Sequence, residues 1–392
     1  MIYYALGLLL ILSALAAACF AASSDAAAAA TSRPAAGKRV IGYYAGWAAS
    51  RGFRPEHIRG ELLTHVNYAF ARVGPDHRIE LRDPDVAEPN FAGLRALKEK
   101  HPHLRTLISV GGWTDSTGFY AMSQIEAGRA AFSESAAAFA SRHGFDGVDL
   151  DWEYPGGGGN DKGLGGPADK RNFTLLLQEL RRRLDEQGAA DRKRYLSTIA
   201  VGAGARPREN LELDEIHKHL DFINLMTYDM GGTWSPRTAF NAPLLPAFDG
   251  ASSADGSVRA YLAGGIPTDK LVLGVPFYGR GYAGVAANAD NGFNQPHDRK
   301  GARGLGGAYR DLAEKHIDKT HRRFWHDAAR VPWLYDETGG TMITYDDPES
   351  LRLKGAYARE QHLGGVMIWE LSEDDEHASL LTALNEGLRE EK

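Results

Sequence analysis

Three carboxylic acids alternate with apolar residues in one short segment of the chain, residues 145–155. Asp149, Asp151 and Glu153 occupy every second position there. Because alternate side chains of a β-strand point to one face, we expect these three groups to form a line. Like charges this close cannot all stay ionised when buried, so at least one carboxyl should keep its proton near neutral pH. A protonated carboxylic acid at a strand end can act as a general acid, which is what breaking a glycosidic bond requires.

A metal site is the main alternative for clustered carboxylates. Divalent sites in a barrel take ligands from several strands, and no His or Asp elsewhere in the sequence pairs with the three acids. We therefore expect no metal and no other cofactor. The glycine run at 156–159 lacks the Lys-Ser/Thr pair of a phosphate-binding loop, so we interpret it as a loop beside the site.

The elements that must position these acids alternate along the chain. Apolar, β-branched segments are separated by amphipathic helical segments such as 169–186. The strand candidates are 40–45, 63–71, 105–110, 147–152, 196–201, 222–227, 271–276 and 365–369. Eight such strands predict an α/β fold of the (β/α)8 type, a TIM barrel. A doubly wound open sheet is the competing fold, but no glycine fingerprint follows the first strand.

Chemistry in such barrels lies at the carboxyl ends of the strands, and aromatic or charged residues follow seven of the eight candidates. The seventh and eighth candidates are separated by far more chain than one crossover needs. We expect a small α+β insertion domain there, at about 281–345, that forms one wall of a groove.

The N-terminal segment predicts export. Residues 5–18 are apolar and small residues follow them, which is typical of a secretory signal at 1–19, with an Ala/Ser-rich disordered tether at 20–37. The single cysteine, Cys19, leaves two alternatives open: ordinary cleavage nearby, or lipid attachment at Cys19. We expect a secreted or cell-envelope protein whose only membrane contact would be that lipid.

The formal charge of the whole chain is −6, which gives no basic surface for nucleic acid. We expect a monomer.

The chain resembles family 18 of the glycoside hydrolases, the chitinase family, over residues 38–385. Its signature D-x-x-D-x-D-x-E is met by Asp146, Asp149, Asp151 and Glu153, and S-x-G-G is met by Ser109, Gly111 and Gly112. Further matches are Met226-Thr-Tyr228-Asp229, Phe277-Tyr278-Gly-Arg280 and Trp369. Asp146 lies three positions before Asp149, so its side chain should point to the opposite face of the strand from the three acids. We therefore expect Asp146 to have a structural role.

The resemblance implies hydrolysis of β-1,4 linkages in chitin or chitooligosaccharides with retention and without an enzyme nucleophile. Glu153 would be the general acid and then the base. Asp151 would hold the acetamido N–H and stabilise the developing positive charge, and Tyr228 would position the acetamido carbonyl. Asp149 would share a proton with Asp151, assisted by Ser109 and Tyr43. The implied substrate-binding residues are Tyr43, Phe70, Ser109, Gly112, Trp113, Tyr154, Met226, Asp229, Tyr278, Arg280 and Trp369. The family also implies cis peptides at Ala69–Phe70, Glu153–Tyr154 and Trp369–Glu370.

Two alternatives to a chitinase stay open. A sugar-binding protein without activity could use the same barrel, but the family's lectin-like members lack the acid that Glu153 supplies here. Cleavage of the chitobiose core of N-glycans, or of another N-acetylglucosamine polymer, is the alternative enzyme activity. The insertion domain and the aromatic rim favour a long groove and hence chitin. Trp47, Trp325 and Trp333 could stack on distal sugars or pack internally, and the sequence does not distinguish end-acting from mid-chain cleavage.

Overall fold

The computed structural model describes residues 34–35, 37–161, 163–302 and 304–389. The predicted signal with Cys19, and the tether up to residue 33, lie outside these ranges. No helix within them combines the length and the apolar character needed to cross a lipid bilayer.

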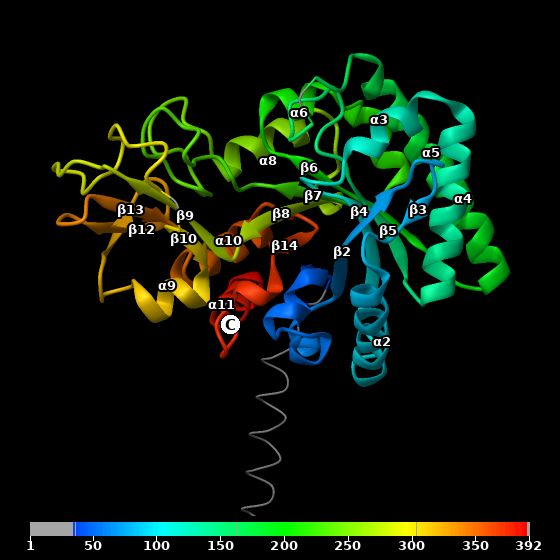
Figure 1. Cartoon of the computed structure of the whole chain (residues 1–392), viewed down its shortest axis with the longest axis horizontal. Coiled ribbons are helices and arrows are strands. Elements are labelled where there is room, and N and C mark those ends of the chain that lie inside the picture. The colour runs from blue at the N-terminus through cyan, green and yellow to red at the C-terminus, as the bar shows by residue number, and fades with distance from the viewer. Residues whose placement is uncertain (1–33, 36, 162, 303, 390–392) are drawn as a thin grey trace, which may run out of the picture.

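A closed barrel of parallel strands forms the centre of the described chain (Figure 1). Its strands are β1 (Arg39–Ala45), β2 (His65–Val73), β4 (Arg105–Gly111), β5 (Gly147–Asp151), β6 (Leu196–Gly202), β7 (Phe222–Met226), β8 (Leu271–Pro276) and β14 (Gly365–Trp369). They pair in the order β1-β14-β8-β7-β6-β5-β4-β2, and pairing of β1 with β2 closes the ring. The predicted TIM barrel is confirmed, and each predicted strand is present to within about two residues at either end. A short strand, β3 (Ile79–Glu80), pairs in antiparallel orientation with the end of β2.

Helices cover the outer face of the barrel (Figure 1). They are α2 (Pro84–Lys100), α3 (Thr117–Gln124), α4 (Glu126–His143), α5 (Ala168–Asp191), α6 (Ala205–Glu209), α7 (Leu213–Ile216), α8 (Ala254–Ala263), α10 (Pro348–Glu360) and α11 (Ser379–Leu388). Short 3-10 helices are η1 (Gly46–Arg51), η2 (Pro55–His57), η3 (Gly60–Leu62), η4 (His217–His219), η5 (Thr268–Lys270) and η6 (Leu371–Glu373). The predicted stripe of α5, which includes Phe173 and Leu180, is fully buried. Trp152 stacks on Phe119 of α3 at a centroid distance of 5.4 Å, so this face of β5 points toward the helices.

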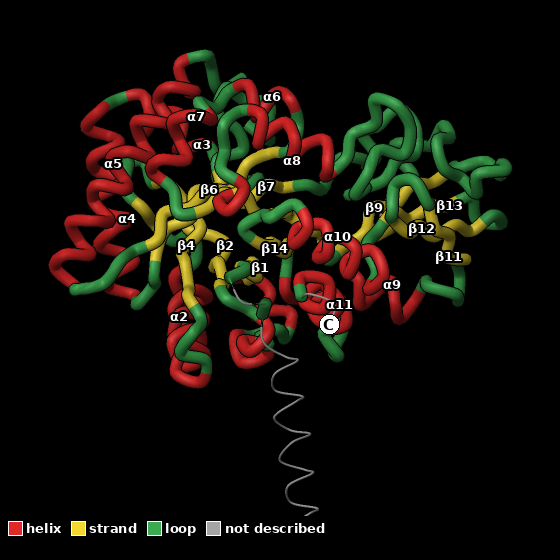
Figure 2. The backbone as a smooth tube through the Cα atoms, turned by 180° about the vertical axis from the view of Figure 1, so that it is seen from behind, coloured by secondary structure: helices red, strands yellow, loops and turns green. Residues whose placement is uncertain are grey.

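The chain between β8 and β14 forms a second sheet beside the barrel, on the left in Figure 1 and on the right in the reverse view of Figure 2. Its strands are β9 (Tyr278–Ala283), β10 (Gly306–Ala308), β11 (Arg322–His326), β12 (Val331–Asp336) and β13 (Thr341–Thr344), with helix α9 (Tyr309–Lys315). All pairs in this sheet are antiparallel. Its first strand follows β8 after one residue, so the sheet begins slightly before the expected position 281. Trp333 and Met342 are buried in a separate apolar core there.

A buried ion pair fixes the return from the second sheet to the barrel. The Lys354 ammonium group of α10 lies 2.6 Å from the Asp346 carboxylate, which follows β13. Both side chains are almost completely inaccessible to solvent. Because a buried charge without a partner costs several kcal/mol, this pair is held in one geometry and fixes α10 relative to the second sheet.

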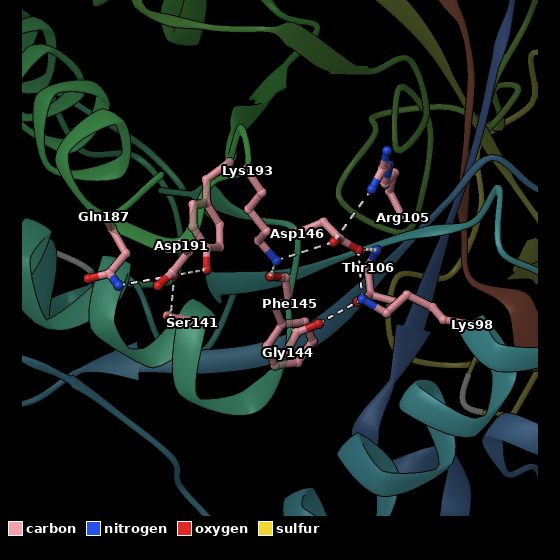
Figure 3. Close-up of polar contacts among 11 residues, drawn as sticks. Lys98, Arg105, Thr106, Ser141, Gly144, Phe145, Asp146, Gln187, Asp191 and Lys193 are labelled. Carbon is pink, nitrogen blue, oxygen red and sulfur yellow. Dashed lines mark hydrogen bonds and ion pairs between the residues drawn. The ribbon is translucent and has the colours of Figure 1, made fainter. Parts of the chain in front are cut away.

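Asp146 lies at the amino end of β5, where cations surround it (Figure 3). Its carboxylate accepts hydrogen bonds from the Thr106 backbone N–H at 2.9 Å and from Lys98 Nζ at 2.8 Å. Lys193 and Arg105 lie 3.5 and 3.8 Å away. Burial opposes the negative charge, but these donors hold the pKa of Asp146 below its usual value. The structural role expected for this first acid of the signature is confirmed, since it joins α2, β4 and β5.

Replacing this carboxylate should destabilise the fold. In Asp146→Ala the Thr106 N–H loses its acceptor and Lys98 its counter-ion, so we expect the free energy of unfolding to fall by about 1–3 kcal/mol. Urea unfolding followed by circular dichroism measures this difference. Asp249→Ala, which removes an exposed carboxylate, is the control and should leave the midpoint unchanged. Equal midpoints for the two variants would contradict the assigned role of Asp146.

Candidate active site

A large cleft of about 1590 Å³ opens at the carboxyl ends of the barrel strands. Residues of the barrel and of β9 in the second sheet line it together. The predicted site residues on its wall are Phe70, Trp113, Asp151, Glu153, Tyr154, Met226, Tyr228, Asp229, Tyr278, Arg280 and Trp369. The topology thus brings together side chains that are separated by up to three hundred residues in the sequence.

Asp149 lies beneath the cleft inside the barrel and is completely buried. Its carboxylate accepts hydrogen bonds from the hydroxyls of Tyr43 and Ser109, each at 2.7 Å, and from Thr198 at 2.6 Å. Burial raises the pKa of Asp149, and the three hydroxyl donors oppose that rise. No hydrogen bond joins it to Asp151 in this structure, so the sharing of a proton between these two acids stays a prediction.

Asp151 and Glu153 lie at the rim of the cleft. Asp151 is 3% exposed, and its Oδ1 has no hydrogen-bond partner within the described residues. Burial, followed by repulsion from Glu153 and Asp149, raises the pKa of Asp151 well above its usual value. Burial also raises the pKa of Glu153 to about 7. Near neutral pH this pair therefore retains a proton, as the sequence predicts, and can donate it to a bound molecule.

The S-x-G-G segment holds the end of β5 in place. The Gly112 N–H donates to the Asp151 carbonyl at 2.7 Å. Gly111 has φ of +109°, and a Cβ at that position would lie 2.2 Å from the same carbonyl oxygen. Any other residue would push β4 away from the acids. The Glu153 backbone N–H donates to the Ser116 hydroxyl at 2.9 Å, which fixes the third acid.

Aromatic rings form the floor of the cleft. The Trp369 indole stacks on Phe70 with centroids 5.6 Å apart and planes 18° apart. Tyr43 and Trp47 contact the same indole at 5.5 and 6.4 Å. The cis peptides predicted at Ala69–Phe70, Glu153–Tyr154 and Trp369–Glu370 are all present. This floor offers flat apolar faces of the kind on which sugar rings stack.

The opposite wall carries polar groups from β7 and β9. Asp229 accepts hydrogen bonds from the Tyr278 hydroxyl at 2.6 Å and from Arg280 Nε at 2.7 Å. The Tyr228 hydroxyl contacts Sδ of Met367 at 3.8 Å and has no stronger partner among the described residues. It is therefore free to bind a ligand that enters beside Asp151.

The structure alters the interpretation of several predicted residues. Tyr43, Ser109 and Gly112 were expected to bind substrate, but they do not line the cleft. Tyr43 and Ser109 hydrogen-bond to Asp149 from below, which is the contact with Asp149 that the resemblance implies for these two residues. Gly112 packs on Phe70, where a Cβ would lie 2.5 Å from the ring. These three residues position other residues of the site, because their places on the strands direct them into the barrel or against its rim.

The structure separates the tryptophans for which the sequence allowed either sugar stacking or internal packing. Trp47 lines the cleft and is 43% exposed. Trp333 is 6% exposed within the core of the second sheet, and neither it nor Trp325 reaches the cleft wall.

Sequence reasoning missed several residues of the cleft wall, and two of them carry large or acidic side chains: Trp234 and Glu373. Trp234 is 51% exposed, lines the cleft and lies 5.0 Å from the Arg280 guanidinium. Its signal was an aromatic residue in the glycine-containing loop directly after Asp229. Glu373 also lines the cleft, and its signal was an acidic run shortly after Trp369.

Comparison with known proteins agrees with this geometry. The model of the Glycosyl hydrolases family 18 matches residues 39–374. Chitinase A1 of Niallia circulans is 39% identical over 88% of this chain, and the chain spans 58% of that protein's length. The solved structure of chitinase ChiA74 from Bacillus thuringiensis has a TM-score of 0.83 and 36% identity, covering 91% of this chain and 71% of that one.

A second solved structure comes from a related enzyme of a different kind. It is a family 18 N-acetylglucosaminidase from Paenibacillus barengoltzii, with a TM-score of 0.79 and 38% identity, covering 89% of this chain and 99% of that one. The family model spans the barrel, the second sheet and all four acids of the signature. The chain therefore belongs to family 18 of the glycosyl hydrolases.

Proposed function

We propose that this protein is a secreted chitinase that hydrolyses β-1,4 linkages between N-acetylglucosamine units by substrate-assisted catalysis with retention. The observation that carries the proposal is the pair Asp151 and Glu153. Both are buried at the rim of a long aromatic cleft, and both have a raised pKa. The names of the relatives support chitin as the polymer, since several of them are chitinases.

The first chemical step needs a proton at the glycosidic oxygen. With a pKa of about 7, Glu153 holds that proton at neutral pH and can deliver it as the bond to the anomeric carbon breaks. The leaving sugar departs as an alcohol, and Glu153 becomes a carboxylate. It then takes a proton from the incoming water, which attacks the anomeric carbon and restores the original configuration.

The nucleophile in this scheme is the carbonyl oxygen of the substrate's own acetamido group, which bonds to the anomeric carbon and forms an oxazolinium-like intermediate. Asp151 accepts a hydrogen bond from the acetamido N–H through its unpartnered Oδ1. The free hydroxyl of Tyr228 orients the carbonyl. Hydrogen bonds from three hydroxyls hold the Asp149 carboxyl group at one position below Asp151.

The length of the cleft supports a polymer as substrate. Three exposed tryptophans line it: Trp47, Trp113 and Trp234. Each can stack on a sugar ring, and a single N-acetylglucosamine unit would leave most of them uncovered. The relative that is an N-acetylglucosaminidase makes release of single units from chain ends the second candidate.

Loss of the acid should abolish cleavage but preserve binding. In Glu153→Gln the amide cannot protonate the glycosidic oxygen, so we expect hydrolysis of chitin hexasaccharide to fall by at least about 100-fold. Product analysis by mass spectrometry measures cleavage and shows which bond is cut, while calorimetry measures binding. Release of single units would support the second candidate, and fragments of two to four units would support cleavage within the chain.

The control for this experiment is cellulose hexasaccharide, which lacks the acetamido group. We expect the wild-type protein not to cleave it, because the attacking group is missing. Binding of chitin hexasaccharide without cleavage by the wild-type protein would instead establish a sugar-binding protein and overturn the proposal.

The pH dependence of turnover should report Glu153. Only the protonated form is active as the acid, so kcat should fall about tenfold per pH unit above about pH 7. The negative charge of Asp229 contributes to the raised pKa of Glu153. In Asp229→Asn that contribution is lost, and the alkaline limb should move to lower pH. Steady-state rates between about pH 5 and about pH 9 test both expectations, and a kcat that stays constant above pH 7 in the wild-type protein would assign the proton to another group.

A further inference from the structure

Glu373 is a half-buried acid of the cleft that the mechanism above does not use. It ends η6, four residues after Trp369, and lines the cleft near β9 of the second sheet. Its Oε2 is inaccessible to solvent and has no hydrogen-bond partner among the described residues. A buried carboxyl oxygen without a partner is costly to maintain, so its place on the wall of a binding cleft points to a ligand group that completes it.

The charges around Glu373 come from three elements. The Glu370 carboxylate, at the end of β14, is 4% exposed, and its two oxygens accept from the Ser372 hydroxyl and backbone N–H. Arg310 of α9 donates to the Ser372 carbonyl, and Arg280 of β9 is engaged with Asp229. Tyr278 of β9 faces the same region, where Glu373 helps to raise its pKa. Both arginines thus have other acceptors, and neither forms an ion pair with Glu373 among the described residues.

Burial and then repulsion from the Glu370 carboxylate raise the pKa of Glu373 to about 8. A hydrogen bond from the Glu370 backbone and the charges of Arg310 and Arg280 oppose this rise more weakly. The neutral carboxyl can both donate and accept one hydrogen bond, as sugar hydroxyls and acetamido groups do. A sugar that covers Glu373 removes it further from water and makes ionisation still less favourable. Binding should therefore be tighter when this carboxyl carries its proton.

We propose that Glu373 is a substrate-binding residue whose carboxyl group hydrogen-bonds to the N-acetylglucosamine unit next to the one on Trp369, on the side of the second sheet. This inference rests on the proposed function, since it needs an N-acetylglucosamine chain in the cleft. It gives the second sheet a part in recognition, because β9 and α9 supply the groups that surround Glu373. It also makes affinity for the chain depend on pH separately from the titration of Glu153.

The test uses the Glu153→Gln protein as the parent, so that Glu153 no longer titrates and the sugar is not cleaved. Calorimetry gives the Kd for chitin hexasaccharide at about pH 6 and about pH 9, on either side of the pKa of about 8. We expect the Kd of the parent to rise about three- to tenfold at the higher pH, the effect of one hydrogen bond. Adding Glu373→Gln, whose amide is always neutral, should remove this rise.

A second variant and a matched control complete the experiment. Glu373→Leu replaces the carboxyl-bearing side chain with an apolar side chain of similar size that forms no hydrogen bond. The Kd of this variant at about pH 6 should therefore be about three- to tenfold above that of the parent. Glu376→Gln removes an exposed carboxylate three residues along and should leave the pH dependence of the parent in place. Thermal unfolding shows that each variant is folded.

Three results would overturn the inference: a parent Kd that does not change with pH, a rise that persists in the Glu373→Gln variant, or a leucine variant that binds as tightly as the parent. The wild-type protein is assayed in parallel with chitin hexasaccharide at about pH 6. Cleavage there with any of these three results rejects the role of Glu373 alone. Absence of both cleavage and binding rejects the proposed function as well.

Discussion

The removal of carboxylates from water at the end of β5 is the constraint on which the rest of this structure depends. Three acids lie within five residues of one strand end and all are buried. Such burial favours the neutral form of each carboxyl group, and the hydrogen bonds that compensate for the lost contact with water differ between the acids. Asp149 has three hydroxyl donors, whereas Oδ1 of Asp151 has none. That difference makes Asp149 a fixed support and leaves Asp151 and Glu153 able to exchange protons with a ligand.

The same distinction separates structural from chemical acids across the molecule. Asp146 and Asp346 are buried, and lysines lie within 2.8 Å of each carboxylate. Their charges are matched inside the fold, and they connect helices to strands. Within the part of the chain that the structure describes, Asp151, Glu153 and Glu373 have no such cation partner, and all three line the cleft. Acids without a salt bridge fall into two groups. Hydroxyl and backbone donors satisfy Asp149 and Glu370 inside the fold. One oxygen each of Asp151 and Glu373 lacks a partner among the described residues, and there we expect a ligand to complete the hydrogen bonds.

The barrel and the second sheet contribute different parts of the site. Barrel strands present the acids and the stacked rings Phe70 and Trp369 at fixed positions, since each strand is paired on both sides. The second sheet adds Tyr278 and Arg280 through β9, which follows β8 after one residue. This short link and the buried Lys354–Asp346 pair hold the sheet at both of its connections. Much of the cleft wall therefore comes from strands that are already paired and residues that follow them directly, so less of the wall has to become ordered when a ligand binds.

The sequence by itself determined the elements and the order of the acids. Alternation along β5 is a local property with a period of two, so it predicts which side chains share a face without any knowledge of neighbours. The eight strands and the stripe of α5 follow from the same kind of local pattern and were confirmed. Tertiary structure alone decided which residues reach the cleft. Trp333 was buried while Trp47 and Trp234 stayed exposed, and Oε2 of Glu373 was left without a partner among the described residues. These outcomes depend on contacts between residues far apart in the chain, and on the water those contacts exclude, which no local pattern encodes.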